Sequence, residues 1–249
     1  MNMYISKKSV EKLSRHIFIT LLLVSLIGCS SNDKVEVVHY GALKNAMKQN
    51  DLTAYVSSET IDLKNFYALG ALEGLKGELL IMDGQVYTSS QGDSTNNSLD
   101  LKQNIDFSAN FLVGAKVSKW ISIDVPKTIK TKSDLEKFVS EKALEQGFDK
   151  ADPFPFLLEG PTKSTSWHVV NWDANDSIHT HEKHIKSGVY DTDLEEDVII
   201  LGFYSEHHKG IFTHHSSFLH MHVLIDKKAI MGHLDDLTLG AKMVLKLPK

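Results

Sequence analysis

The residues with the most evident chemistry are histidines. The chain of 249 residues has 13 of them, and 11 lie between His168 and His233. The most regular spacing is Leu219-His220-Met221-His222-Val223, where imidazoles alternate with apolar side chains. Side chains two residues apart on a strand project to the same face, so His220 and His222 are expected to point together.

A third imidazole follows at His233, eleven residues after His222. The intervening residues 226–229 are typical of a hairpin loop, and a loop centred between Lys227 and Lys228 places His233 directly opposite His222. Three histidines would then converge on one face and leave a fourth position open, as in catalytic zinc sites. A three-residue loop would reverse the parity and separate His233 from the pair. The alternative interpretation is a scatter of half-buried histidines on a polar face.

The other histidines give weaker signals. His179, His181 and His184 do not form H-E-x-x-H, because the outer pair of His181-Glu-Lys-His184 is only three residues apart. A second group, typical of a solvated loop, precedes the H-x-H strand and contains His207, His208, His214 and His215. Of these, His214 or His215 could line the mouth of a pocket. The roles of His179, His181, His184, His214 and His215 stay open at this point. No G-x-S-x-G elbow, P-loop or G-x-G-x-x-G occurs, so serine hydrolase, NTPase and Rossmann functions have no support.

The elements that must hold these side chains are predicted to be mostly strands, in one α+β domain that is mainly β. A strand and a short helix over 42–49 begin it, and Asp83-Gly84 predicts a hairpin. Glycines at 70, 74 and 77 indicate turns between short strands, and residues 90–98 a polar loop. The clearest helix spans 133–147, with Ser133 as N-cap, Glu136 completing a capping box and Gly147 ending it. Further strands are expected at 78–82, 85–88, 107–117, 121–125, 156–159, 167–172, 197–204, 219–225 and 229–234.

Composition excludes several classes of protein. Hydrophobic residues make up 42% and charged residues 24%, as in a globular chain. The mean hydropathy of −0.17 argues against several membrane spans. A net charge of −5 and a pI near 6.2 argue against a nucleic-acid-binding surface.

The N-terminus has the pattern of a bacterial lipoprotein signal. A basic segment precedes the apolar run 17–27, which is too short to span a bilayer that needs about 20 residues. The run ends in Leu26-Ile27-Gly28-Cys29, and Cys29 is the only cysteine. We therefore expect a signal peptide over 1–28, a lipidated Cys29, a polar tether over 29–36 and a folded domain over 37–249. The domain would be exported and anchored to a bacterial membrane on its periplasmic or cell-surface side. An N-terminal helix with a buried cysteine is the alternative.

Three stretches share their pattern with a known family. The segment 70–87 has punctuating glycines, then G-E-L and D-G. Residues 202–205 are followed, after a loop, by His220 and His222, and Gly232-His233 supplies a third histidine at the family's spacing. On these residues the chain resembles the α-acetolactate decarboxylases, zinc enzymes of the butanediol pathway. The resemblance implies a two-part β structure, in which a larger open sheet or barrel packs against a smaller one and the metal lies at their junction.

The resemblance also implies site residues. His220, His222 and His233 match the zinc ligands, and Glu78 matches an active-site glutamate near the metal. Without the resemblance, Glu78 would be interpreted as a solvent-facing strand residue.

Two positions depart from the family pattern. The family binds the substrate carboxylate with an arginine, and His168 occupies the aligned position, while Arg15 in the signal segment is the only arginine of the chain. A protonated imidazole offers one donor in place of a bidentate fork. The family also brings a C-terminal glutamate to the metal, and no glutamate follows Glu206 here.

The expected function is zinc-dependent decarboxylation of a small 2-hydroxy-3-oxo acid, specifically (S)-2-acetolactate to (R)-acetoin and carbon dioxide. Zn²⁺ would act as a Lewis acid, Glu78 as proton donor and His168 as carboxylate holder. The alternative is a lipid-anchored protein that binds a metal or small molecule without decarboxylase activity. A metal-dependent isomerase or lyase acting on another α-hydroxy carbonyl compound lies between the two. Expected partners are a small-molecule substrate and the membrane through the lipid anchor only, with no nucleic acid, and a homodimer is left open.

Overall fold

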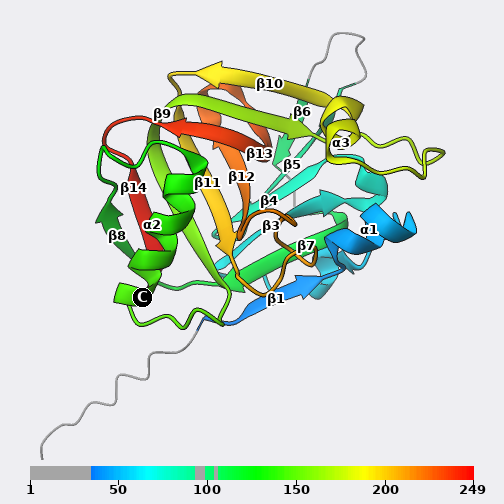
Figure 1. The fold of residues 1–249 in the computed structure, drawn as a ribbon. Helices are drawn as coiled ribbons and strands as arrows, with labels where there is room; N and C mark the ends of the chain where they lie inside the picture. Colours follow the sequence, from blue (N-terminus) through cyan, green and yellow to red (C-terminus); the bar gives the residue numbers. More distant parts are fainter. Residues whose placement is uncertain (1–34, 93–98, 104–105) are drawn as a thin grey trace, which may run out of the picture. The chain divides into compact units, whose positions relative to one another are not determined.

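The computed structural model describes residues 35–92, 99–103 and 106–249 (Figure 1). The predicted signal peptide and Cys29, and most of the tether, lie outside these residues. All described elements belong to the unit Lys34–Lys249. In the described part of the chain, no helix is long and apolar enough to cross a membrane.

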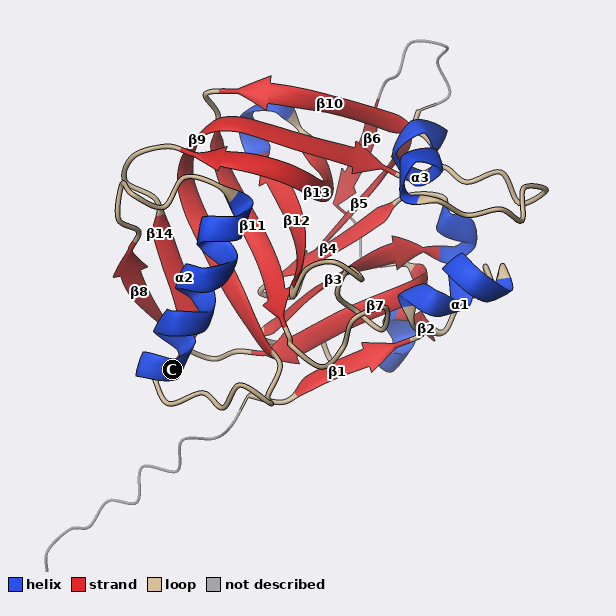
Figure 2. Ribbon diagram, in the orientation of Figure 1, coloured by secondary structure: helices blue, strands red, loops and turns tan. Residues whose placement is uncertain are grey.

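Strands dominate the fold, as Figure 2 shows. The first sheet contains seven antiparallel strands within the described ranges, in the order β1-β7-β3-β4-β5-β6, with β2 also paired to β7. The predicted Asp83-Gly84 turn joins β4 to β5, and both residues have the positive φ that tight hairpins require. The strands are β1 (Val37–Tyr40), β2 (Val56–Ser57), β3 (Phe66–Leu72), β4 (Glu78–Met82), β5 (Gln85–Gln91), β6 (Leu99–Gln103) and β7 (Ser108–Lys116).

The second sheet also has seven strands among the described residues, and part of it closes on itself. The first half of β9 pairs with β11 and its second half with β13, so β11, β12, β13 and β9 form a four-stranded barrel. The strands are β8 (Trp120–Asp124), β9 (Phe154–Val169), β10 (Val189–Leu194), β11 (Asp197–Tyr204), β12 (Leu219–Ile225), β13 (Ile230–Leu239) and β14 (Val244–Pro248). The expected mainly β architecture with a barrel and a second sheet is confirmed.

The helices are short and lie outside the sheets. They are α1 (Leu43–Gln49), α2 (Lys132–Glu145) and α3 (His181–Ser187), with 3-10 turns η1 (Ser58–Thr60), η2 (Glu73–Leu75) and η3 (Asp226–Lys228). The predicted cap of α2 was wrong, because Thr131 accepts a hydrogen bond from the Asp134 amide and Asp134 closes the capping box. Thr131 also bridges to Thr238 of β13, which fixes where the helix begins.

Two strand predictions also need correction. Residues 156–159 and 167–172 were expected as separate strands, but β9 is one strand of 16 residues, in which Gly160 has a φ of +131°. Gly70 was expected at a turn, but it lies inside β3, where a Cβ would come within 2.0 Å of the Phe111 carbonyl oxygen. Close packing of β3 on β7 therefore explains this glycine.

The alternation along β12 separates the core from the site. Leu219, Met221, Val223 and Ile225 belong to the apolar core shared by the barrel strands and α2. Leu224 on the other face packs with residues of both sheets, and His220 and His222 share its parity. The H-x-H pattern is thus that of a strand buried on two sides, one apolar and one facing the first sheet.

Candidate metal centre

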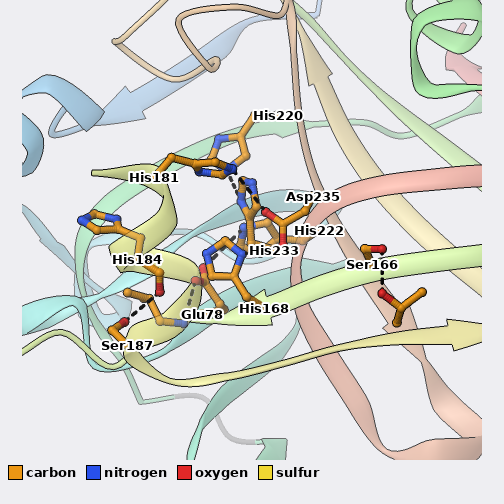
Figure 3. A network of polar contacts seen from close by, with 12 residues as sticks. Glu78, Ser166, His168, His181, His184, Ser187, His220, His222, His233 and Asp235 are labelled. Atoms are coloured by element: carbon orange, nitrogen blue, oxygen red, sulfur yellow. Dashed lines mark hydrogen bonds and ion pairs between the residues drawn. The ribbon is translucent and has the colours of Figure 1, made fainter. Parts of the chain in front are cut away.

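The three predicted ligands come together at the junction of the two sheets. His222 on β12 is paired with His233 on β13, which is the register expected from the sequence. One nitrogen from each of His220, His222 and His233 lies within 4.8 Å of the other two. Nε2 of His220 and Nδ1 of His233 are only 3.2 Å apart. Figure 3 shows these imidazoles gathered with His168, Glu78 and Asp235.

Neighbouring groups orient the ring of His220. Its Nδ1 lies 2.8 Å from the carbonyl oxygen of Phe212, in the loop that precedes β12. A carbonyl accepts only, so Nδ1 carries the proton and the lone pair of Nε2 faces His233. Phe111 of β7 stacks on the ring, with centroids 5.6 Å apart. Such an outer hydrogen bond fixes the tautomer that a metal ligand needs.

His222 is the clearest sign that an ion belongs here. The side chain is fully buried, and neither ring nitrogen makes a hydrogen bond with the described residues, although Nε2 lies 3.5 Å from Oε2 of Glu78. Burying polar groups without partners costs free energy, and a metal ion would satisfy one of these nitrogens. The donor set of three imidazoles fits a divalent transition metal with an open coordination position.

The electrostatics favour the neutral form of all three rings. Burial lowers the pKa of His220 to about 4. Burial, with the neighbouring imidazoles, holds the pKa of His222 and His233 well below the ordinary value. Since only the neutral ring can offer a lone pair to a metal, the group is in its ligand form at neutral pH.

Glu78 reaches the histidines from the first sheet. It begins β4, is 4% exposed, and accepts a hydrogen bond from the Val170 amide at 3.3 Å. Its Oε2 lies 3.5 Å from Nε2 of His222. Burial raises the pKa of Glu78 to about 7. A carboxyl group that changes protonation near neutral pH can donate or accept a proton. Because the side chain is buried, the alternative interpretation of Glu78 as a solvent-facing residue was wrong.

His168 is held by an acid that sequence reasoning did not identify as part of the site. Nδ1 of His168 lies 2.8 Å from Oδ2 of Asp235. Burial opposes protonation of this ring, but the hydrogen bond and charge of Asp235 outweigh it and raise the pKa of His168. Asp235 is the extra residue of a β-bulge, because β13 shifts register against β9 between Leu234 and Asp236. Its signal in the sequence was Asp235-Asp236 between two core leucines.

Five other histidines divide between the rim of the site (His181, His214 and His215) and a separate pair (His179 and His184). His181 on α3 is 3.8 Å from Oδ1 of Asp235, and its ring lies 5.2 Å from that of His214. His214 and His215 are in the loop between β11 and β12, as expected. His179 and His184 instead lie 2.8 Å apart, nitrogen to nitrogen, and both pack on Trp172.

A lysine near the site was also missed. Lys132, the first residue of α2, extends its ammonium to the carbonyl oxygen of Asp235, 2.9 Å away. Burial lowers its pKa, against the opposing effect of nearby carboxylates led by Asp235. It lies 88 to 101 residues before the histidines of β12 and β13, and the packing of α2 on the second sheet brings it to them, which the sequence does not display.

Comparison with known proteins supports the fold. No protein-family model matches the chain, and no curated protein matches it. Among solved structures, α-acetolactate decarboxylase from Bacillus subtilis strain 168 superposes with a TM-score of 0.65 and 17% identity, covering 86% of this chain and 85% of that one. The enzyme from B. subtilis subspecies spizizenii superposes with a TM-score of 0.65 and 18% identity, with 86% of each chain covered. A Staphylococcus aureus protein of unknown function, described as similar to α-acetolactate decarboxylase, superposes with a TM-score of 0.64 and 17% identity. The match covers 84% of each chain.

The chain therefore has the fold of the α-acetolactate decarboxylases. The resemblance found in the sequence is confirmed at the level of the fold, and the buried group His220, His222 and His233 can hold a metal ion.

Proposed function

We propose that the protein is a zinc-dependent carboxy-lyase acting on a small 2-hydroxy-3-oxo acid, with (S)-2-acetolactate to (R)-acetoin and carbon dioxide as the specific reaction. The observation that carries the proposal is the buried three-histidine group with Glu78 beside it, on an acetolactate decarboxylase fold. Three neutral imidazoles with an open position suit Zn²⁺ in a catalytic role.

His220, His222 and His233 would hold the metal. When bound, zinc supplies a Lewis acid that withdraws electrons from the hydroxyl and carbonyl oxygens of the substrate. The ring of His220 is fixed by the Phe212 carbonyl and the stacked Phe111, and strand register places His222 opposite His233.

Glu78 would move the proton. Loss of carbon dioxide breaks a carbon–carbon bond and leaves its electron pair on the substrate, so that carbon must then accept a proton. Glu78 has a pKa of about 7, and a large fraction of it is protonated at neutral pH. Its buried position beside His222 keeps bulk water from competing as the donor.

His168 would hold the substrate carboxylate. Its Nδ1 is engaged by Asp235, so Nε2 is the nitrogen left to donate. The raised pKa favours a protonated, positively charged ring. A charge-assisted hydrogen bond to a carboxylate is the contact that such a ring offers.

The test is acetoin formation from racemic acetolactate by the purified protein, with one equivalent of zinc and a chelated control. We expect turnover that depends on zinc and consumes half of the racemate. His222→Ala should abolish it, while His207→Ala, in an exposed loop, should not. A folded, zinc-loaded protein without turnover would refute the decarboxylase function.

A second candidate is a metal- or small-molecule-binding protein without turnover. The observation that favours it is the rim of histidines outside the buried group, where His181 is 48% exposed. Such a protein would exchange zinc readily and leave acetolactate unchanged, so the same assay, with zinc exchange measured in parallel, separates the two.

We also propose export and anchoring through a lipidated Cys29. The support is the sequence pattern alone: a basic segment, an apolar run too short for a span, and the only cysteine of the chain at its end. Metabolic labelling with a radioactive fatty acid, in the wild-type protein and in Cys29→Ala, tests the anchor, since the label should appear only in the first.

A further inference from the structure

The site holds one lysine that the proposed mechanism does not use. Lys132 lies at the N-terminus of α2, a helix whose start is fixed by the bridge between Thr131 and Thr238 of β13. The ammonium donates to the carbonyl oxygen of Asp235 at 2.9 Å. The ammonium of Lys132 therefore contacts Asp235 directly, and the carboxylate of Asp235 holds His168.

The carboxylates of Asp235, Asp236 and Glu136 lie near Lys132, but its ammonium contacts a backbone oxygen rather than a carboxylate and so stays available to an anion. Asp235 is paired with His168, whose Nδ1 is 2.8 Å from its carboxylate. Glu136 accepts hydrogen bonds from the Ser217 hydroxyl and the Phe218 amide. Nζ of Lys132 has three protons, and the hydrogen bond found for it within the described ranges, to a backbone oxygen, uses one.

Lys132 also stands out among the cations of the described chain. No arginine occurs there, since Arg15 lies outside it. Ion pairs at the surface raise the pKa of Lys186, Lys227 and Lys228. Burial instead lowers the pKa of Lys132. Its ammonium contacts the backbone of Asp235, two residues after His233 on β13, which places it near the metal group.

We propose that Lys132 binds the carboxylate of the ligand together with His168 and makes the site selective for anionic 2-hydroxy acids. This inference rests on the proposed function for the substrate class. The ligand would lie with its oxygens towards His220, His222 and His233 and its carboxylate towards β13 and the start of α2. Removing one charge-assisted hydrogen bond from such a ligand weakens binding by about 10- to 100-fold.

Two unreactive ligands that differ only in the carboxylate test this selectivity. The anion is 2,3-dihydroxy-2-methylbutanoate, and the neutral match is 2-methylbutane-2,3-diol, in which a methyl group replaces the carboxylate. Titration calorimetry on the zinc-loaded protein measures both affinities. We expect Lys132→Met to weaken the affinity for the anion by about 10- to 100-fold and to change the affinity for the diol by no more than about twofold.

Matched variants separate charge from structure. Lys132→Arg keeps the charge and should retain most of the affinity for the anion, and Lys137→Met, exposed on the same helix, should change neither ligand. The proposal would be overturned if Lys132→Met lost affinity for both ligands equally, or if its affinity for the anion were unchanged. A wild-type protein that binds the diol as tightly as the anion would also overturn it, a result independent of whether the variant folds. Lysine-dependent anion binding without acetolactate turnover would refute the decarboxylase function and keep this inference.

Discussion

His222 and His233 lie directly opposite each other in the antiparallel ladder of β12 and β13. His233 is in turn opposite His168 on β9, so one row of cross-strand pairs carries three of the four central imidazoles. The pairing depends on a hairpin that turns through η3 and Ala229, with Ile225 opposite Ile230. A change of one residue in that turn would place His233 on the other face.

The close approach of β13 to β9 makes Gly232 sensitive to substitution. A Cβ at this position would lie 2.7 Å from the His168 carbonyl oxygen. We expect Gly232→Ala to force the strands apart, to cost about 1–3 kcal/mol of stability and to weaken zinc binding. Urea unfolding and a zinc competition titration measure the two effects. Thr238→Ala, exposed on the same strand, is the control, and a Gly232→Ala protein with wild-type stability and zinc affinity would show that the strand spacing is not constrained.

Glu78 makes the metal-free protein less stable as pH rises. Its pKa is raised from 4.5 to about 7, so the folded state binds a proton that the unfolded state releases. This carboxyl group alone should remove about 3 kcal/mol of stability between about pH 4.5 and pH 7, whereas His220, His222 and His233, whose pKa values are lowered, should add stability over the same range. Glu78→Gln should therefore become more stable relative to the wild-type protein as pH rises through this range. Urea midpoints of both proteins between pH 5 and pH 8 test it, and parallel curves would contradict the raised pKa of this buried carboxyl group.

Asp235 is expected to control the charge of His168. The raised pKa of His168 means that its contribution to stability is complete below about pH 6.5 and is lost as pH rises through the folded value. In Asp235→Asn burial is opposed only by the smaller effect of Glu78, so the pKa of His168 should fall. An NMR titration of the His168 Cε1–H resonance measures this directly. Asp236→Asn, exposed beside it, should leave the curve unchanged, and an unshifted curve in Asp235→Asn would remove Asp235 from this role.

Local patterns predicted much of the fold and the metal group. Alternation along β12 and the hairpin parity placed His220, His222 and His233 together, because strand geometry has a period of two and little freedom. The resemblance, rather than periodicity, pointed to Glu78, which comes from the other sheet.

What the sequence did not reveal depends on long-range packing. Asp235 reaches His168 through a β-bulge, and Lys132 reaches β13 through the docking of α2. Lys132 has no local signature, and the pair Asp235-Asp236 between core leucines does not by itself reveal the bulge. The cap of α2 was misplaced by two residues for a similar reason, since T-x-x-D and S-x-x-E overlap there and the bridge from Thr131 to Thr238 decides between them.

The most direct test of the account is the metal content of the protein. After incubation with excess zinc and extensive dialysis, elemental analysis should find one zinc per chain in the wild-type protein and in the His207→Ala control. His222→Ala should lose the bound zinc while its circular dichroism spectrum shows that the β structure is kept. Less than stoichiometric zinc in the wild-type protein, or zinc fully retained by His222→Ala, would contradict the assignment of His220, His222 and His233 as a metal centre.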